Sequence, residues 1–122
     1  MKRLAFFAIA LSVVPAAASA KTVEDGFPRG SLAVAAIERG DLNRAEALLR
    51  TSVLDRDDPA RLINLGAVYL RMGRTGEAVA AWRAALASNR HTEVETLSGR
   101  WLSTRDIARE ALANYETAAV NR

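Results

Sequence analysis

The strongest constraint on the fold is an internal repeat, in which one segment of the chain matches a later segment at a fixed offset. The match lays residues 32–54 (LAVAAIERGDLNRAEALLRTSVL) over residues 65–87 (LGAVYLRMGRTGEAVAAWRAALA). Each segment has apolar residues at helical spacing on both sides of a glycine, Gly40 in the first and Gly73 in the second. Each segment is therefore predicted to form a helix, a glycine-containing turn and a second helix.

Small residues inside these expected helices alternate with isolated large aromatic residues. Gly66 stands in the middle of a helix, where glycine costs about 1 kcal/mol relative to alanine. Close approach of a neighbouring helix explains such a residue, and Ala33 has the same position in the first segment. Tyr69 and Trp82 stand on opposite sides of the turn and are expected to fill the space opposite the small positions. The pattern predicts two antiparallel helices that pack closely.

The turns carry their own signals. Gly40 and Gly73 stand where the first helix of each segment is expected to end, and glycine adopts the left-handed conformation that a tight helix stop favours. Asp41 and Thr75 follow them as expected caps of the second helices, since their side-chain oxygens can accept a free backbone N–H.

These residues resemble the tetratricopeptide repeat family, in a short secreted form. Residues 59–92 carry the family's signature at Leu62, Leu65, Gly66, Tyr69, Gly73, Ala78, Trp82 and Ala85. Residues 26–58 match more weakly, with Ala36 and Leu49 where aromatic residues are usual. The resemblance implies a right-handed stack of helix pairs whose first helices line a concave surface.

The repeat ends near residue 92, and the tail has a different pattern. Short alternating runs that include Val94, Trp101 and Leu102 flank Ser98-Gly99, which predicts a β-hairpin with a two-residue turn. Trp101 is expected to fill the core rather than anchor a partner. Ser103 or Thr104 should cap a final helix, whose apolar face is predicted to comprise Ile107, Ala108, Ala111, Leu112 and Tyr115.

The expected fold class is therefore mainly α, a short α-solenoid of two repeats with a C-terminal cap. Residues 31–92 hold the repeats, residues 21–30 a linker and residues 93–122 the hairpin-and-helix cap. The cap should cover the open end of the second repeat, because a solenoid generally needs about three units to bury a core. A degenerate third repeat is the alternative for residues 93–122.

Residues 1–20 have the layout of a secretory signal peptide. Lys2 and Arg3 precede an apolar run, residues 4–14, and Ala18-Ser19-Ala20 forms a small-x-small cleavage site. Cleavage after Ala20 would give a periplasmic or secreted protein without stable membrane insertion. A retained N-terminal anchor is the alternative, although the apolar run is short for a bilayer span.

The charges do not indicate a nucleic-acid partner. The chain has 17 basic and 14 acidic side chains, and two of the basic ones, Lys2 and Arg3, would leave with the leader. The remaining charges are nearly balanced and alternate in sign, as on a solvated helical surface. The chain has no Cys, so packing rather than disulfides must hold the fold.

The sequence offers little for catalysis, and no catalytic residue, metal site or cofactor is expected. His91 is the single histidine and is predicted to lie solvated in a loop. Asp55, Asp57 and Asp58 suggest a calcium loop, but Ala60 and Gly66 stand where that loop needs Gly and Glu. A solvated turn at a helix N-terminus is the preferred interpretation.

The resemblance does imply a protein-binding groove on the concave surface. Asn64 lies where chaperone-binding relatives hold a peptide carboxylate, but Gly30 and Val34 replace their accompanying Lys and Asn, so an apolar helix or extended segment is the better ligand. In the alternative interpretation these residues pack against the tail. The predicted groove residues are Val34, Ile37, Glu38, Ile63, Asn64, Ala67, Leu70 and Arg71.

The function expected from these features is a non-enzymatic protein-protein interaction module, an adaptor or assembly factor of the periplasm or cell envelope. A self-associating structural protein, which pairs through its open repeat end or its hairpin edge, is the second hypothesis. A small hydrolase is the third and is disfavoured by the residues available.

Overall fold

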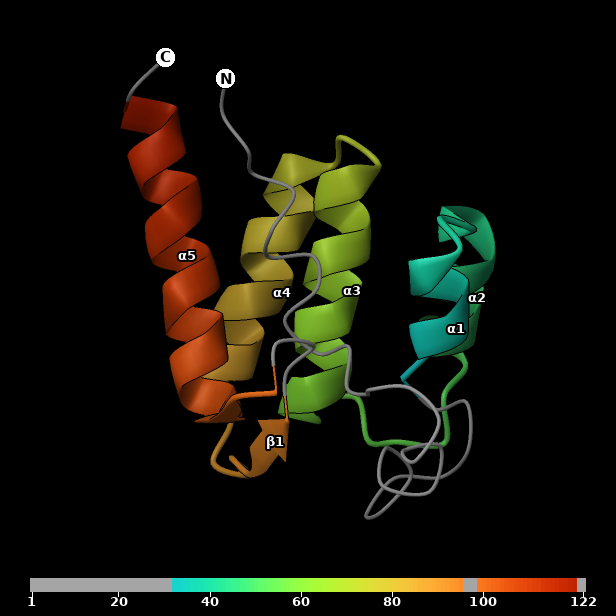
Figure 1. Cartoon of the computed structure of the whole chain (residues 1–122), viewed down its shortest axis with the longest axis horizontal. Helices are drawn as coiled ribbons and strands as arrows, with labels where there is room; N and C mark the ends of the chain where they lie inside the picture. The colour runs from blue at the N-terminus through green and yellow to red at the C-terminus, as the bar shows by residue number, and fades with distance from the viewer. Residues whose placement is uncertain (1–31, 96–98, 121–122) are drawn as a thin grey trace.

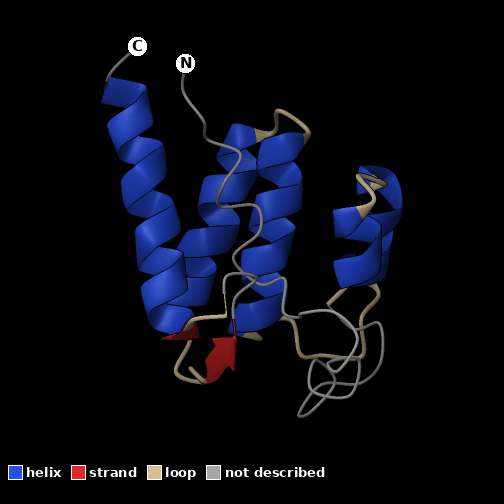
Figure 2. Ribbon diagram, viewed as in Figure 1, coloured by secondary structure: helices blue, strands red, loops and turns tan. Residues whose placement is uncertain are grey.

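The computed structural model describes residues 32–95 and 99–120, which are mainly helical (Figures 1 and 2). Its elements, in chain order, are α1 (Val34–Glu38), α2 (Leu42–Arg50), α3 (Pro59–Arg71), α4 (Thr75–Ala87), β1 (Glu93–Glu95), β2 (Trp101–Ser103) and α5 (Thr104–Val120). The predicted fold class is confirmed: two helix pairs are followed by a hairpin and a helix. The expected leader and linker lie outside the described residues.

The helices form a layered stack with α3 at its centre (Figure 1). α3 packs against α4 on one side and against α2 on the other, while α5 packs mainly on α4 and also touches α3. Every residue of α3 from Pro59 to Tyr69 is buried. α5 thus adds a third layer beyond the second repeat, as expected of a cap.

The two glycine turns are as predicted, and one of the two caps is not. Gly40 and Gly73 have φ angles of 75° and 79°, in the left-handed region. The side chain of Asp41 accepts the Arg44 N–H at 3.4 Å. The prediction that Thr75 caps α4 is wrong, because Thr75 is the first helical residue and Arg74 precedes it. The two turns are equally long, so Arg74 occupies the place of Asp41, and a guanidinium cannot accept an N–H.

α3 begins as the sequence predicts. Pro59 is its first residue, where the missing N–H has no intrahelical partner to lose. Asp58 caps the helix by accepting the Arg61 N–H at 3.0 Å. Asp55 and Asp57 of the same loop form ion pairs with Arg90, which follows α4. The acidic turn therefore joins the two repeats at their loop ends.

The large and small residues of the repeat meet as expected. Trp82 of α4 is 1% exposed and lies directly on Gly66 of α3. A Cβ at Gly66 would lie 2.6 Å from Cδ1 and 2.9 Å from Cε2 of the indole, so only glycine permits this approach. The indole Nε1 donates to the carbonyl of Ile63 at 3.4 Å.

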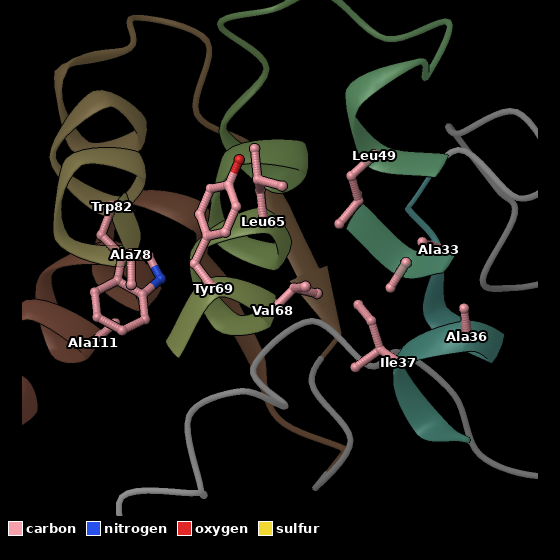
Figure 3. Packing of buried hydrophobic residues seen from close by; sticks show 11 residues of the cluster. Ala33, Ala36, Ile37, Leu49, Leu65, Val68, Tyr69, Ala78, Trp82 and Ala111 are labelled. Atoms are coloured by element: carbon pink, nitrogen blue, oxygen red, sulfur yellow. The ribbon is translucent and has the colours of Figure 1, made fainter. Parts of the chain in front are cut away.

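Two apolar clusters tie the layers together. The first runs through the whole stack (Figure 3) and comprises Ala33, Ala36, Ile37, Ala45, Leu49, Leu65, Val68, Tyr69, Ala78, Trp82 and Ala111. The second joins both repeats to the hairpin and to α5, and comprises Leu32, Ala60, Leu62, Ile63, Ala85, Val94, Ile107 and Ala108. The predicted apolar face of α5 is confirmed, with Leu112 and Tyr115 partly buried against the first cluster.

The hairpin differs from its prediction in two respects. Glu95 pairs with Trp101, whereas a two-residue turn at Ser98-Gly99 would pair it with Leu102. Gly99 is left-handed with φ 79°, and Ser98 lies outside the described residues. Trp101 is 61% exposed instead of buried. Val94 is buried and the paired Leu102 is half-buried, and because neighbours on a strand alternate in direction, Trp101 faces away from the core.

None of the helices in the described ranges is long and apolar enough to span a membrane.

The contact between Gly66 and Trp82 makes a direct test of this packing. We expect Gly66→Ala to destabilise the protein by about 1–3 kcal/mol, because the new methyl overpacks a fixed indole. Trp82→Ala alone should cost about 3–5 kcal/mol. In the Trp82→Ala background, Gly66→Ala should instead stabilise the protein by up to about 1 kcal/mol through helix propensity. Denaturant unfolding of the four proteins measures this cycle, and equal effects of Gly66→Ala in both backgrounds would contradict the contact.

Candidate functional site

The predicted groove residues fall into two groups in the structure. Ile37, Ile63, Asn64 and Ala67 are buried. Val34 and Leu70 are half-buried, and Glu38 and Arg71 are exposed. The predicted groove is therefore not open along its length in this conformation.

Ile63 is covered by the segment before α1 and by the hairpin and α5, which lie outside the repeats. It is 1% exposed and shares its apolar cluster with Leu32 before α1, Val94 of β1 and Ile107 of α5. The alternative interpretation, in which concave positions pack against the tail, describes this residue. A partner could reach Ile63 only if these elements moved.

Asn64 makes a hydrogen bond within the fold. Its Nδ2 donates to the carbonyl of Leu32 at 2.9 Å, and the residue is 1% exposed. Because the bond joins α3 to the segment just before α1, Asn64 links the two repeats. The amide nitrogen of Asn64 is thus occupied within the fold.

The accessible part of the predicted groove lies at the junction of α1 and α3. We call Val34, Glu38, Leu70 and Arg71 the repeat rim. Arg71 Nη1 donates to the carbonyl of Ile37 at 2.9 Å, so its cation lies at the carboxyl end of α1. Glu38 is exposed on that helix. The repeat rim thus presents one acid, one anchored cation and two half-buried apolar side chains.

Arg74 holds the two repeats together, a role that sequence reasoning missed. Its guanidinium contacts both carboxylate oxygens of Glu46 on α2, at 2.9 and 3.0 Å, and both of Glu77 on α4, at 2.7 and 2.6 Å. It also lies 4.4 Å from the centroid of the Tyr69 ring. The spacing of Arg74 and Glu77 was a visible signal, but the contact with Glu46 needs the fold.

The charges of this network reinforce one another. The hydrogen bond from Arg74 holds the pKa of the Glu77 carboxyl below its usual value. In return, the hydrogen bonds that Arg74 donates to Glu77, and next those to Glu46, raise the pKa of the Arg74 guanidinium. Both side chains are partly exposed, so water and salt weaken the pairing.

Arg61 is a second cation with a structural role that the sequence did not reveal. It is 8% exposed, and its Nε and Nη1 donate to the carbonyls of Leu49 at 2.7 Å and Arg56 at 3.0 Å. Burial, and next the nearby Arg56, lower the pKa of Arg61. The Leu49 carbonyl belongs to the last turn of α2, where a cation also complements the helix dipole.

His91 is half-buried rather than solvated, which corrects the sequence expectation. Its Nε2 lies 3.4 Å from the carbonyl of Leu86 and its Nδ1 lies 3.0 Å from Oγ1 of Thr104. Because a carbonyl oxygen only accepts, Nε2–H donates to Leu86, and the Thr104 hydroxyl is the partner of Nδ1. The imidazole therefore ties the end of α4 to the start of α5, with both nitrogens occupied.

Among residues 32–95 and 99–120, no group of three His, Cys, Asp or Glu side chains is placed to hold a metal ion.

A family model for the tetratricopeptide repeat matches residues 27–51 and 59–84. The first match includes α1 and α2, and the second includes α3 and most of α4. The two helix pairs are therefore tetratricopeptide repeats, as the sequence resemblance implied. The hairpin and α5 lie outside both matches. Comparison with curated proteins and with solved structures finds no match.

A stability measurement can test whether Asn64 has a structural role in the fold. We expect Asn64→Ala to lower the free energy of unfolding by about 1–3 kcal/mol, because the Leu32 carbonyl loses its buried donor. The exposed Asn43→Ala on α2 is a suitable control and should change stability by less than about 0.5 kcal/mol. Denaturant unfolding measures both variants, and an Asn64→Ala protein as stable as the control would disprove the structural role.

The Arg74 network predicts a pH dependence that involves Glu77. Its folded pKa is depressed, so its stabilising effect is present above the unfolded pKa of about 4.3 and disappears as the pH falls through the folded value. Glu77→Gln should therefore lower Tm at about pH 7, and the difference from wild type should shrink steadily below about pH 4. Glu116→Gln is the control, because it removes one negative charge from an exposed residue of α5. A Tm difference that stays constant over this range would refute the prediction.

Proposed function

We propose that the two tetratricopeptide repeats serve as a protein-protein interaction module, an adaptor or assembly factor of the periplasm or cell envelope. The observation that carries the proposal is the match of two such repeats to α1–α4. Repeats of this kind bind other proteins.

The partner-binding surface in this proposal is the repeat rim. Val34, Glu38, Leu70 and Arg71 are the four predicted groove residues that keep exposed surface. The anchored guanidinium of Arg71 presents a cation of fixed position, and Glu38 adds a carboxylate on the neighbouring helix. An apolar helix or extended segment with charges at its edge would complement this surface.

The proposed location is supported by the sequence of residues 1–20. A basic start, an apolar run and a small-x-small site are together typical of an export signal. After cleavage at Ala20 the protein would begin at Lys21 and meet its partner outside the cytoplasm.

Capture of partners by the full chain in its own host tests both parts of this proposal. The chain carries a C-terminal tag, and the envelope fraction is analysed by mass spectrometry for bound proteins and for the N-terminus of the tagged chain. We expect an N-terminus at Lys21 and a partner whose recovery falls about tenfold in Glu38→Arg/Arg71→Ala, since a few rim contacts carry much of the binding energy.

The control is Glu110→Arg/Arg83→Ala, which makes the same changes of charge at exposed positions of α5 and α4. Melting curves of all variants establish that they remain folded. A folded rim variant that captures the same proteins as wild type would exclude the repeat rim. A full-length chain in the membrane would show that the leader is retained as an anchor.

A further inference from the structure

The hairpin presents an aromatic side chain that the fold does not use. The two tryptophans differ sharply, because Trp82 is 1% exposed and Trp101 is 61% exposed. The other large exposed apolar residues of the described ranges, Val53 and Val120, lie in a loop and at the last residue of α5. Trp101 instead lies on β2, so backbone N–H and C=O groups of a strand lie next to the indole.

The register of the hairpin shows which main-chain groups face outward. The Thr104 N–H donates to the carbonyl of Thr92 at 2.9 Å, which extends the ladder by one hydrogen-bonded pair. Such pairs alternate in antiparallel strands, so Glu95 and Trp101 form a non-hydrogen-bonded pair, as do Glu93 and Ser103. The N–H and C=O of Trp101 therefore point to the free edge of β2. Within the described ranges no third strand pairs with this edge.

The same face of the hairpin is acidic. Paired residues point to one side of a sheet, so Glu95 lies beside Trp101, and Glu93 lies two residues further along β1. Glu93 is exposed and Glu95 is half-exposed. Among the described residues, no ion pair includes either glutamate, whereas Glu46, Glu77 and Asp55 are all paired with arginine. The face thus offers an indole and two carboxylates that pair with no cation of the described residues.

We propose that the free edge of β2 binds an extended segment of a partner protein that carries arginine or lysine at alternate positions. The segment adds a third strand, with main-chain hydrogen bonds to Trp101. A residue opposite Trp101 projects its side chain onto the same face, where an arginine stacks on the indole. Glu95 lies two strand spacings from it, about 10 Å, so the long side chain can extend toward the carboxylate.

A second copy of the chain suits this edge less well. Antiparallel pairing of two β2 edges would place Glu93 and Glu95 of both copies on one face. The carboxylates of the two copies would lie about three strand spacings (~14 Å) apart and none would gain a counter-charge, whereas a basic segment compensates the two that are present. This surface is distinct from the repeat rim, so the inference stands or falls independently of the proposed function.

Two short peptides test the proposal against the full chain: acetyl-Thr-Arg-Val-Arg-Thr-amide and the same peptide with Glu for both Arg. Binding is measured by calorimetry and by the fluorescence of Trp101. We expect the Arg peptide to bind with Kd below ~1 mM and the Glu peptide at least about tenfold more weakly. Trp101→Ala should abolish binding, and Val53→Ala, which alters an exposed apolar residue elsewhere, should leave it unchanged.

The charge and the ladder are tested separately. Glu95→Lys should reverse the preference between the two peptides, because the carboxylate next to Trp101 becomes a cation. N-methylation of both Arg amides should abolish binding, whereas N-methylation of the Val amide should not, because in an antiparallel third strand only the Arg N–H groups face β2.

Three results would overturn the proposal. The first is a folded wild-type chain that binds neither peptide. The second is binding of equal strength to both peptides, or binding that survives Trp101→Ala. The third is a dimer in solution that Trp101→Ala converts to a monomer, which would assign the edge to a second copy of the chain.

Discussion

The contact between Trp82 and Gly66 sets the geometry on which the other layers depend. An indole that rests on bare backbone fixes how closely α3 and α4 approach, and its Nε1 also bonds the Ile63 carbonyl. The first cluster then extends from this contact in both directions, through Leu49 to α2 and through Ala111 to α5. A side chain at position 66 would separate the pair against which α2 and α5 pack.

The small number of repeats explains why so much of the predicted groove is buried. Two helix pairs alone leave one side of the second pair without a covering layer, and a short solenoid gains stability by covering it. α5 supplies one additional layer, and the segment before α1 bonds Asn64 through the Leu32 carbonyl. Ile63 and Asn64 are thus part of the core, and the accessible part of the predicted groove is the repeat rim.

The repeat, the glycine turns and the Trp82 contact could be predicted because each depends on neighbours at fixed spacing. The predictions that were wrong or incomplete concern residues whose position depends on other factors, such as turn length, strand alternation or contacts with distant parts of the chain. The hydroxyl of Thr75 favours this residue as a cap because it can accept an N–H, yet the turn length places Arg74 there. The size of Trp101 favours the core, but strand alternation gives the inward positions to Val94 and Leu102. Similarly, position in a repeat indicates the face on which Ile63 lies, but not what covers it.

The charged side chains differ in whether they bind a group within the fold, and this difference indicates which of them a partner protein can recognise. Arg61 and Arg71 bind backbone carbonyls, and Arg74 and Arg90 bind carboxylates that join one repeat or loop to the next. These four arginines therefore hold parts of the fold together. Within the described part of the chain, Glu93 and Glu95 have no such partner, and the hairpin is held by its ladder and by Val94. The hairpin thus presents an acidic face around Trp101, and a partner can recognise it without disturbing the fold.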